Sequence, residues 1–329
     1  NVASSAVYRM ISMGASLIMV PLLLDWLGTA EYGIWLTIQA VVSWFMLFDL
    51  GLGNGLRNKL AEAMAHDKLE EARTLVSTAY AIISAIAILI FAGFFATQFL
   101  LDWSVIFNAP GSLEGTIGTA VTIVFAFFSI QFVFQLIKMI LMADQRPSLA
   151  ALINTVGTVI SLGAIAVLMR YSSGDLVLVA SIISGANVLV LLAANFWAFR
   201  GKYKAYRPSW KLVKRQHVRS LTNIGFQFFI LQGAALVVFA TDNMIITQMI
   251  GPEAVPAYNI AFKYFNLVMV FFTLLTVPYW SAFTEAYHTG DFAWIQRTVL
   301  ALMRIWAVSL AVVALMLLAA PAVYNLWVG

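Results

Sequence analysis

The chain has 329 residues, of which 62% are hydrophobic and only 10% are charged. A soluble domain carries about 25% charged residues, so this composition excludes a soluble globular protein and indicates several apolar helices in lipid. The net charge of +4 is explained by Lys and Arg in cytoplasmic loops, and we expect no nucleic-acid partner.

Hydrophobic segments long enough to cross about 30 Å of hydrocarbon as a helix recur along the whole chain. They cover residues 3–24, 33–53, 74–101, 116–141, 149–170, 176–199, 222–249, 257–283 and 297–320. Their length and the lack of period-two alternation exclude strands. The sequence therefore predicts an all-α, polytopic transmembrane bundle. Because the first residue is Asn1 rather than Met, we expect native residues ahead of it.

Basic residues are divided unevenly between alternate loops. Four loops contain no Lys or Arg: 25–32, 102–115, 171–175 and 250–256. The intervening loops are basic, most densely at 200–221. Since basic loops face the cytoplasm, we expect the N-terminus and the basic loops on that side. The basic loop at 54–73 has Leu56 and Leu60 at helical spacing and is expected to form a short helix on the membrane face.

The two halves of the chain share a pattern. Gly28 opens an outer loop with Glu62 34 residues later, and Gly251 and Glu285 repeat this arrangement at an offset of 223 residues. The offset spans six predicted helices, an even number, which indicates parallel repeats. We predict two lobes of six helices each, with the second lobe truncated after about three. The predicted parts are an N-terminal lobe at 1–199, a basic cytoplasmic linker at 200–221 and a partial C-terminal lobe at 222–329.

Polar side chains follow one face of four predicted helices. On the first, Ser5, Arg9 and Ser12 are four and three residues apart, the spacing of one helical face. The matching residues on the others are Gln131, Gln135 and Lys138; Asn154, Thr158 and Ser161; and Asn259, Lys263 and Asn266. Four such faces predict a shared polar cavity. The alternative is that neutral polar residues join helices by hydrogen bonds.

Ionisable residues inside membrane spans are costly and usually functional. The candidates are Arg9, Asp49, Lys138, Asp242, Lys263 and Arg304. Near the cytoplasmic helix ends, snorkelling or capping is the alternative explanation. Asp242 and Lys263 have similar depth on consecutive helices, so they form either an ion pair or a substrate or proton site. Four basic residues against two acidic ones favour an anionic substrate, with phosphate a good match for Arg and Lys.

Familiar catalytic and metal-binding patterns are missing from the sequence. The chain has no P-loop, no HExxH and no G-x-S-x-G motif, and it has no cysteine. The glycines from Gly51 to Gly55 superficially resemble a nucleotide loop, but they follow a transmembrane helix rather than a strand. We expect these glycines to end the second helix. We expect no catalytic residue, no metal site and no cofactor.

Two stretches resemble the bacterial polysaccharide flippases of the multidrug/oligosaccharidyl-lipid/polysaccharide exporter superfamily. The first includes Glu31-Tyr-Gly-Ile-Trp35 and Asp49-Leu-Gly-Leu-Gly-Asn-Gly-Leu-Arg57. The second includes Asp242-Asn-Met-Ile-Ile and Tyr258-Asn-Ile-Ala-Phe-Lys263. The resemblance implies a bacterial inner-membrane protein with two lobes around a central cavity. Its partners would be an undecaprenyl-pyrophosphate-linked glycan of the O-antigen type, membrane lipid and other polysaccharide assembly proteins.

The activity that the resemblance implies is flipping of the lipid-linked oligosaccharide from the cytoplasmic to the periplasmic leaflet by alternating access. From charge and depth in this sequence, we assign Arg9, Lys138, Lys263 and Arg304 as candidate substrate contacts. Asp242 is a candidate coupling or gating residue, and Asp49 with Arg57 is expected to shape the cytoplasmic gate.

Three alternatives stay open at this point. A lipid II flippase of the same superfamily would carry a similar lipid-linked cargo. A cation-coupled multidrug or metabolite antiporter would need a deep carboxylate, for which Asp242 is the candidate, but the basic bias argues against it. A glycan polymerase, ligase or glycosyltransferase is disfavoured because the longest outer loop, 102–115, holds only Asp102 and Glu114 as charged residues.

Overall fold

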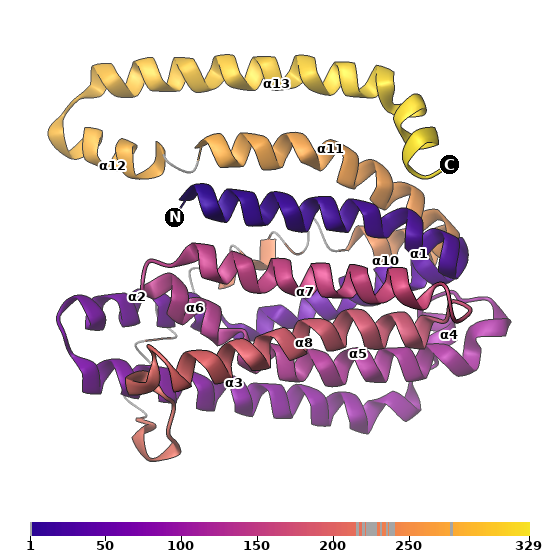
Figure 1. Ribbon diagram of the computed structural model, residues 1–329, viewed down its shortest axis with the longest axis horizontal. Helices are drawn as coiled ribbons and strands as arrows, with labels where there is room; N and C mark the ends of the chain where they lie inside the picture. Colours follow the sequence, from indigo (N-terminus) through magenta and orange to yellow (C-terminus); the bar gives the residue numbers. More distant parts are fainter. Residues whose placement is uncertain are drawn as a thin grey trace. The chain divides into compact units, whose positions relative to one another are not determined.

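The computed structural model describes residues 2–214, 217–218, 221, 229–230, 232–234, 236, 241–276 and 279–329. Every regular element among these residues is a helix (Figure 1), which confirms the predicted all-α fold. Seven helices in the described part of the chain are long and apolar enough to cross a membrane. Part of the predicted span 222–249 and part of the predicted linker lie outside the described residues. The chain divides into two compact units, Asn1–Pro256 and Ala257–Gly329.

Helix α1 (Val2–Phe45) contains the first predicted span and most of the second. Two helices meet at Gly28 within this element, so the connection that we expected at 25–32 is present but is reduced to a kink at one residue. The φ and ψ angles of Gly28 are 77° and 173°, which lie outside the helical region. Glycine adopts a positive φ without the clash that a Cβ atom would cause. A single residue therefore redirects the chain.

The turn after α1 is where the predicted helix end falls. A short 3₁₀ helix, η1 (Met46–Asp49), is followed by Leu50 and Gly51, both in the left-handed conformation. Gly51 thus separates the two helices as expected, whereas Gly53 and Gly55 lie inside α2 (Leu52–Ala65). The α2 helix exists as predicted, but its apolar face is buried. This face packs on α3 (Leu69–Thr97) and α6 (Leu136–Ala143) within the unit, and the position of α2 on the membrane face stays a prediction.

The remaining helices of the first unit pack side by side (Figure 1), with the main contacts in the pairs α1–α7, α5–α8, α7–α8 and α3–α5. Asp102 and Asp175 cap α4 and α8 by accepting backbone N–H bonds. The longer elements are α3 (Leu69–Thr97), α5 (Glu114–Phe134), α6 (Leu136–Ala143), α7 (Pro147–Leu168) and α8 (Leu176–Arg200). The shorter ones are η2 (Gln98–Leu100), α4 (Trp103–Ile106), η3 (Gly111–Leu113), η4 (Lys204–Tyr206), η5 (Trp210–Leu212), α10 (Asp242–Met249) and η6 (Pro252–Ala254).

Aromatic packing and buried hydrogen bonds hold this unit together. The rings of Phe94 on α3 and Phe125 on α5 are stacked with centroids 4.1 Å apart, and Phe45 of α1 meets Phe125 edge-on at 4.9 Å. Between α3 and α8, the hydroxyl of Tyr80 donates to Asn195 Oδ1 at 2.7 Å. Helices in lipid associate through packing and hydrogen bonds of this kind, since apolar burial alone favours no association there.

In Figure 1, α2 and α6 lie at one end of the first unit, and α4 lies with the bend of α1 at the other. We call these the α2 end and the α4 end.

The second unit contains most of α11 (Val255–Thr276), α12 (Tyr279–Thr289) and α13 (Phe292–Trp327). The hydroxyl of Tyr264 on α11 donates to the backbone carbonyl of Met316 on α13 at 3.1 Å, and its ring contacts Tyr324. Asp291 caps α13 through the backbone N–H of Trp294. The ninth predicted span, 297–320, lies inside α13, and the predicted division into repeat lobes stays a prediction.

Candidate functional site

Three of the predicted polar faces meet in the half of the first unit nearer the α2 end. On α1, Ser12 Oγ lies 3.2 Å from Thr158 Oγ1 of α7. One turn earlier on α7, Asn154 Oδ1 accepts a hydrogen bond of 3.3 Å from Lys138 Nζ of α6. Thr158 itself donates to the backbone carbonyl of Asn154 at 3.0 Å. We call Ser12, Thr158, Asn154 and Lys138 the polar line.

A cation lies toward each end of the polar line. Lys138 is half-buried. Arg9 is exposed and precedes Ser12 by three residues, which places it on the same face of α1. Among the described residues, no Asp or Glu lies within ion-pair distance of either cation. Their charges are therefore not neutralised by a carboxylate in this part of the chain, which favours an anionic ligand.

The other predicted residues of the first unit lie apart from the polar line or support it. Gln135 separates α5 from α6, and its amide approaches the sulfur of Met46 at 3.6 Å. Ser5 and Gln131 are half-buried on the same helical faces as Ser12 and Lys138. Ser161 is buried and donates to the carbonyl of Gly157.

Asp49 has a local structural role at the α2 end. Its Oδ1 accepts a hydrogen bond of 2.9 Å from the backbone N–H of Gly53 in the first turn of α2. Arg57 lies further along α2 and is exposed. The N-cap residue of α2 is Gly51, and the Asp49 side chain, two residues earlier, supplies an acceptor for the first turn of α2. A part in gating stays a prediction for both residues.

Substitutions of Asp49 separate the acceptor from the charge. Asp49→Asn keeps an acceptor for the Gly53 N–H, so we expect it to unfold within a few tenths of a kcal/mol of wild type. Asp49→Ala removes the acceptor and should cost about 1 kcal/mol. Thermal unfolding of the detergent-solubilised protein measures both. Equal losses for the two variants would show that the charge, rather than the acceptor, stabilises this turn.

Two of the four predicted cations belong to the second unit. Asn259, Lys263 and Asn266 share one face of α11, and Lys263 is half-buried. Arg304 is exposed on α13. Asp242, at the start of α10, belongs to the first unit. A common site for all four cations, and a pair between Asp242 and Lys263, stay predictions.

A charged cluster at the α2 end joins the turn between α6 and α7 to the segment after α8. Asp144 Oδ2 lies 2.5 Å from Lys202 Nζ, 2.6 Å from the Tyr203 hydroxyl and 3.1 Å from Arg146 Nε. Partial burial raises the pKa of Asp144, but the hydrogen bonds from Lys202 and Tyr203 and the charges of Lys202 and Arg146 outweigh it. The pKa of Asp144 therefore lies below its ordinary value of 3.8.

This depressed pKa predicts a pH-dependent stability. The ionised carboxylate stabilises the fold above pH 3.8 and loses this contribution as the pH falls through the lower folded-state pKa. Asp144→Asn should thus lower the free energy of unfolding by up to about 1 kcal/mol near neutral pH, since Lys202 and Arg146 are about half exposed. The difference from wild type should shrink as the pH falls below 3.8 and through the lower folded-state pKa. Thermal unfolding over a pH series from neutral to acid measures it, with exposed Asp67→Asn as the control. An undiminished difference at the acid end of the series would contradict the linkage.

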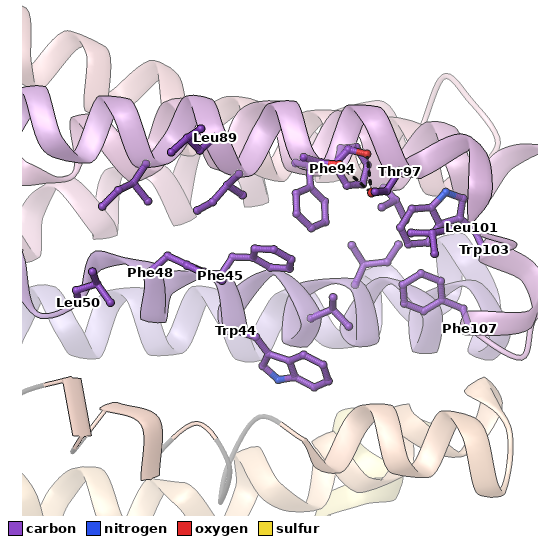
Figure 2. Close-up of a pocket in the computed structure, with 17 residues that line it drawn as sticks. Trp44, Phe45, Phe48, Leu50, Leu89, Phe94, Thr97, Leu101, Trp103 and Phe107 are labelled. Carbon is purple, nitrogen blue, oxygen red and sulfur yellow. Dashed lines mark hydrogen bonds between the residues drawn. The ribbon is translucent and has the colours of Figure 1, made fainter.

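A separate cavity of about 750 Å³ lies between the second half of α1 and α3. Figure 2 shows Phe45 and Phe94 facing one another across it, with Trp103 and Phe107 toward the α4 end and Leu50 at the other. No ionisable residue lines this cavity, and no predicted site residue does so. Sugars and pyrophosphate would lose their hydrogen bonds to water there without replacement. The cavity is therefore not the glycan site.

Sequence reasoning missed one group of polar contacts, at the α4 end. Thr37 on α1 and Thr247 on α10 are both fully buried there, and their hydroxyl oxygens are 2.7 Å apart. A weak signal was present, because Gly33 and Thr37 are four residues apart on α1 and form a small, smooth face.

The fold as a whole is that of a known class of membrane transporters. It is similar to a multidrug resistance MATE family transporter of the MOP superfamily solved in an inward-facing conformation, with a TM-score of 0.78, 18% identity, and coverage of 98% of this chain and 75% of that chain. A structure titled as the outward-facing conformation of such a transporter gives a TM-score of 0.69 at 18% identity, covering 99% and 73% of the two chains. These likenesses establish a multi-pass helical membrane fold of the MATE type.

Residues 1–284 match the family model described as polysaccharide biosynthesis protein, and the chain belongs to this family. It is 24% identical over 286 residues to a candidate O-antigen transporter of Salmonella typhi, covering 86% of this chain and 64% of the relative. It is 25% identical over 285 residues to a candidate O-antigen export protein of Yersinia pseudotuberculosis, covering 84% and 63%. The chain thus spans less than two thirds of these curated relatives. The predicted family resemblance is confirmed.

Proposed function

We propose that the full-length protein is a transporter that flips an undecaprenyl-pyrophosphate-linked oligosaccharide across the bacterial inner membrane. The observation that carries the proposal is the polar line, with its two cations, inside a chain of the polysaccharide biosynthesis family. A pyrophosphate group is a strong acceptor and pairs well with Lys and Arg in a medium of low dielectric constant. The names of the curated relatives support a glycan cargo.

The polar line and the neighbouring Arg9 offer groups for different parts of the cargo. The Lys138 ammonium has three donors, one of which is used by Asn154, and the Arg9 guanidinium has five. Both can therefore bind pyrophosphate oxygens, while the hydroxyl and amide groups of Ser12, Thr158 and Asn154 match sugar hydroxyls. The polyprenyl tail would remain in lipid, because transfer of its apolar surface to water is unfavourable. The uneven loop charge supports a cytoplasmic α2 end, so the polar line would meet cargo from that side.

Alternating access is the mechanism that suits this arrangement. A headgroup of several sugars needs a polar path that is open to one side of the membrane at a time. Transporters with a similar fold have been solved in inward-facing and outward-facing conformations. Lys263 and Arg304 of the second unit stay candidate contacts to an anionic cargo, as their charge and depth in the sequence predict.

Deletion of the full-length gene tests the proposal. Loss of surface polysaccharide with accumulation of lipid-linked oligosaccharide, both reversed by the wild-type gene, is the expected result. Normal surface polysaccharide in a deletion strain without a second copy of the gene would overturn the proposal.

A multidrug antiporter is the second candidate, because the solved structures with a similar fold are multidrug transporters. Cationic drugs favour carboxylates, whereas the polar line bears cations. We therefore expect unchanged drug susceptibility in the deletion strain. A marked rise in susceptibility together with normal surface polysaccharide would favour the antiporter.

A further inference from the structure

The second half of α1 approaches η6 at the α4 end with no room for a side chain. A Cβ atom on Gly33 would lie 1.8 Å from the carbonyl oxygen of Pro252 and 3.3 Å from Cδ of Pro256. Backbone is the near neighbour, so a larger residue could not be accommodated by a side-chain rotation. The φ angle of Gly33 is not in the left-handed region, so its backbone conformation does not require glycine. Glycine is required because the two backbones come so close.

Hydrogen bonds surround this close approach. Thr37, one turn after Gly33, meets Thr247 of α10 at 2.7 Å between the two Oγ1 atoms. The side-chain amide of Asn108, just after α4, donates to the backbone carbonyl of Thr247 at 3.1 Å. The side-chain amide of Gln248 donates to the backbone carbonyl of Val105 at 3.1 Å. Helix α10 is therefore joined to both α1 and α4.

The attachment of α10 itself is shallow, whereas Gly251 and Pro252 just after it are buried. Thr247 is the buried residue of this helix, whereas Ile245, Met249 and Ile250 beside it are 51%, 80% and 73% exposed. Breaking the hydrogen bonds of α10 and uncovering the buried Pro252 and Val255 has a cost that cargo binding must offset. An interlocked apolar core would not separate so readily.

The position of α10 in the chain gives this contact a mechanical consequence. Helix α10 is followed by η6 and then by α11, which leads into the second unit. It also lies beyond the basic segment that the sequence predicts as the linker between lobes. A contact between α10 and α1 thus ties the start of the predicted C-terminal lobe to the N-terminal lobe at one end of the bundle.

We propose that Gly33, Thr37, Asn108, Thr247, Gln248 and Pro252 form a separable seal at the α4 end, closed in this structure, that opens to release cargo. This inference rests on the proposed transport function and assigns residues to one step of it. The seal closes the end opposite the polar line, so cargo bound at the polar line would be held from the far side until α10 leaves α1.

A cysteine pair tests the seal directly. Residues 1–329 contain no cysteine. The Oγ1 atoms of Thr37 and Thr247 are 2.7 Å apart, so the sulfur atoms of two cysteines at these positions would need to move only slightly to form an S–S bond of about 2.0 Å. In the full-length protein with Thr37→Cys and Thr247→Cys, an oxidant should form the disulfide and reduce polysaccharide export at least about tenfold, with recovery on reduction. Each single cysteine variant is the matched control and should keep its export under oxidant.

The outcomes separate the seal from the transport function. Failure of the reduced pair and of both single variants to support any export, with the wild type equally inactive, would count against the transport function. A complete disulfide with unchanged export would overturn the seal, as would absence of any disulfide under oxidant. In the same background Gly33→Ala should slow disulfide formation because it prevents close approach. Gly93→Ala, which meets no atom within 4 Å, should leave the rate unchanged.

Discussion

Replacement of Lys138 by alanine is expected to reduce polysaccharide export at least about tenfold while the protein still inserts in the membrane. Lys138 is half-buried, donates to Asn154 and has no carboxylate partner among the described residues. A hydrogen bond from a charged group contributes about 1.5–3 kcal/mol, which corresponds to roughly a tenfold to hundredfold change in binding. Surface polysaccharide per cell, normalised to protein in the membrane, measures the effect.

Two variants show whether the charge at this position is what matters. Lys138→Arg keeps the charge and should retain a substantial part of the export, although the guanidinium has a different shape. Lys211→Ala removes an exposed cation outside the polar line and should leave export unchanged. Full export by Lys138→Ala would remove this residue from the candidate site.

Replacement of Gly174 by alanine is expected to lower the stability of the first unit by about 1–3 kcal/mol. A Cβ atom at Gly174 would lie 1.8 Å from the carbonyl oxygen of Trp26, just before the bend in α1. The Trp26 indole also donates to the carbonyl of Ser172 at 3.0 Å. The loop between α7 and α8 and the α1 bend would both have to move to admit the methyl group.

The melting temperature in detergent and the yield of folded protein measure this loss. Gly163→Ala is the matched control, because Gly163 lies in α7 with no atom within 4 Å of its would-be Cβ. Alanine also favours the helix at that position, so the control should be at least as stable as wild type. A Gly174→Ala protein with wild-type stability would show that the loop between α7 and α8 can move to admit the methyl group without loss of stability, which would contradict the prediction.

Hydropathy located the described helices that are long enough to cross a membrane, because a backbone in lipid must satisfy its own hydrogen bonds and long apolar runs therefore form helices. It misjudged the connections. The polar residues at 25–32 predicted a loop of several residues, whereas the two helices within α1 are separated by a kink at Gly28 alone. The spacing of Leu56 and Leu60 predicted the apolar face of α2, but not that this face would be completely buried against neighbouring helices.

The candidate site was predictable where helical spacing decides which residues share a face. Spacings of three and four residues placed Ser12, Lys138 and Asn154 on polar faces, and the structure brings these faces together. The contact of Gly33 with Pro252 was out of reach, because it depends on packing between residues far apart in the chain. No local pattern specifies such a register. The same reason leaves a common site with Lys263 and Arg304 as a prediction.

The leaflet in which the lipid-linked oligosaccharide resides tests the central claim most directly. It can be measured in right-side-out and inverted membrane vesicles with a lectin that does not cross the bilayer. Strains that lack the gene, carry the wild-type gene or carry Lys138→Ala would be compared. We expect the glycan in the periplasmic leaflet with wild type, and in the cytoplasmic leaflet with the deletion and with Lys138→Ala. The same distribution in all three strains would contradict the account.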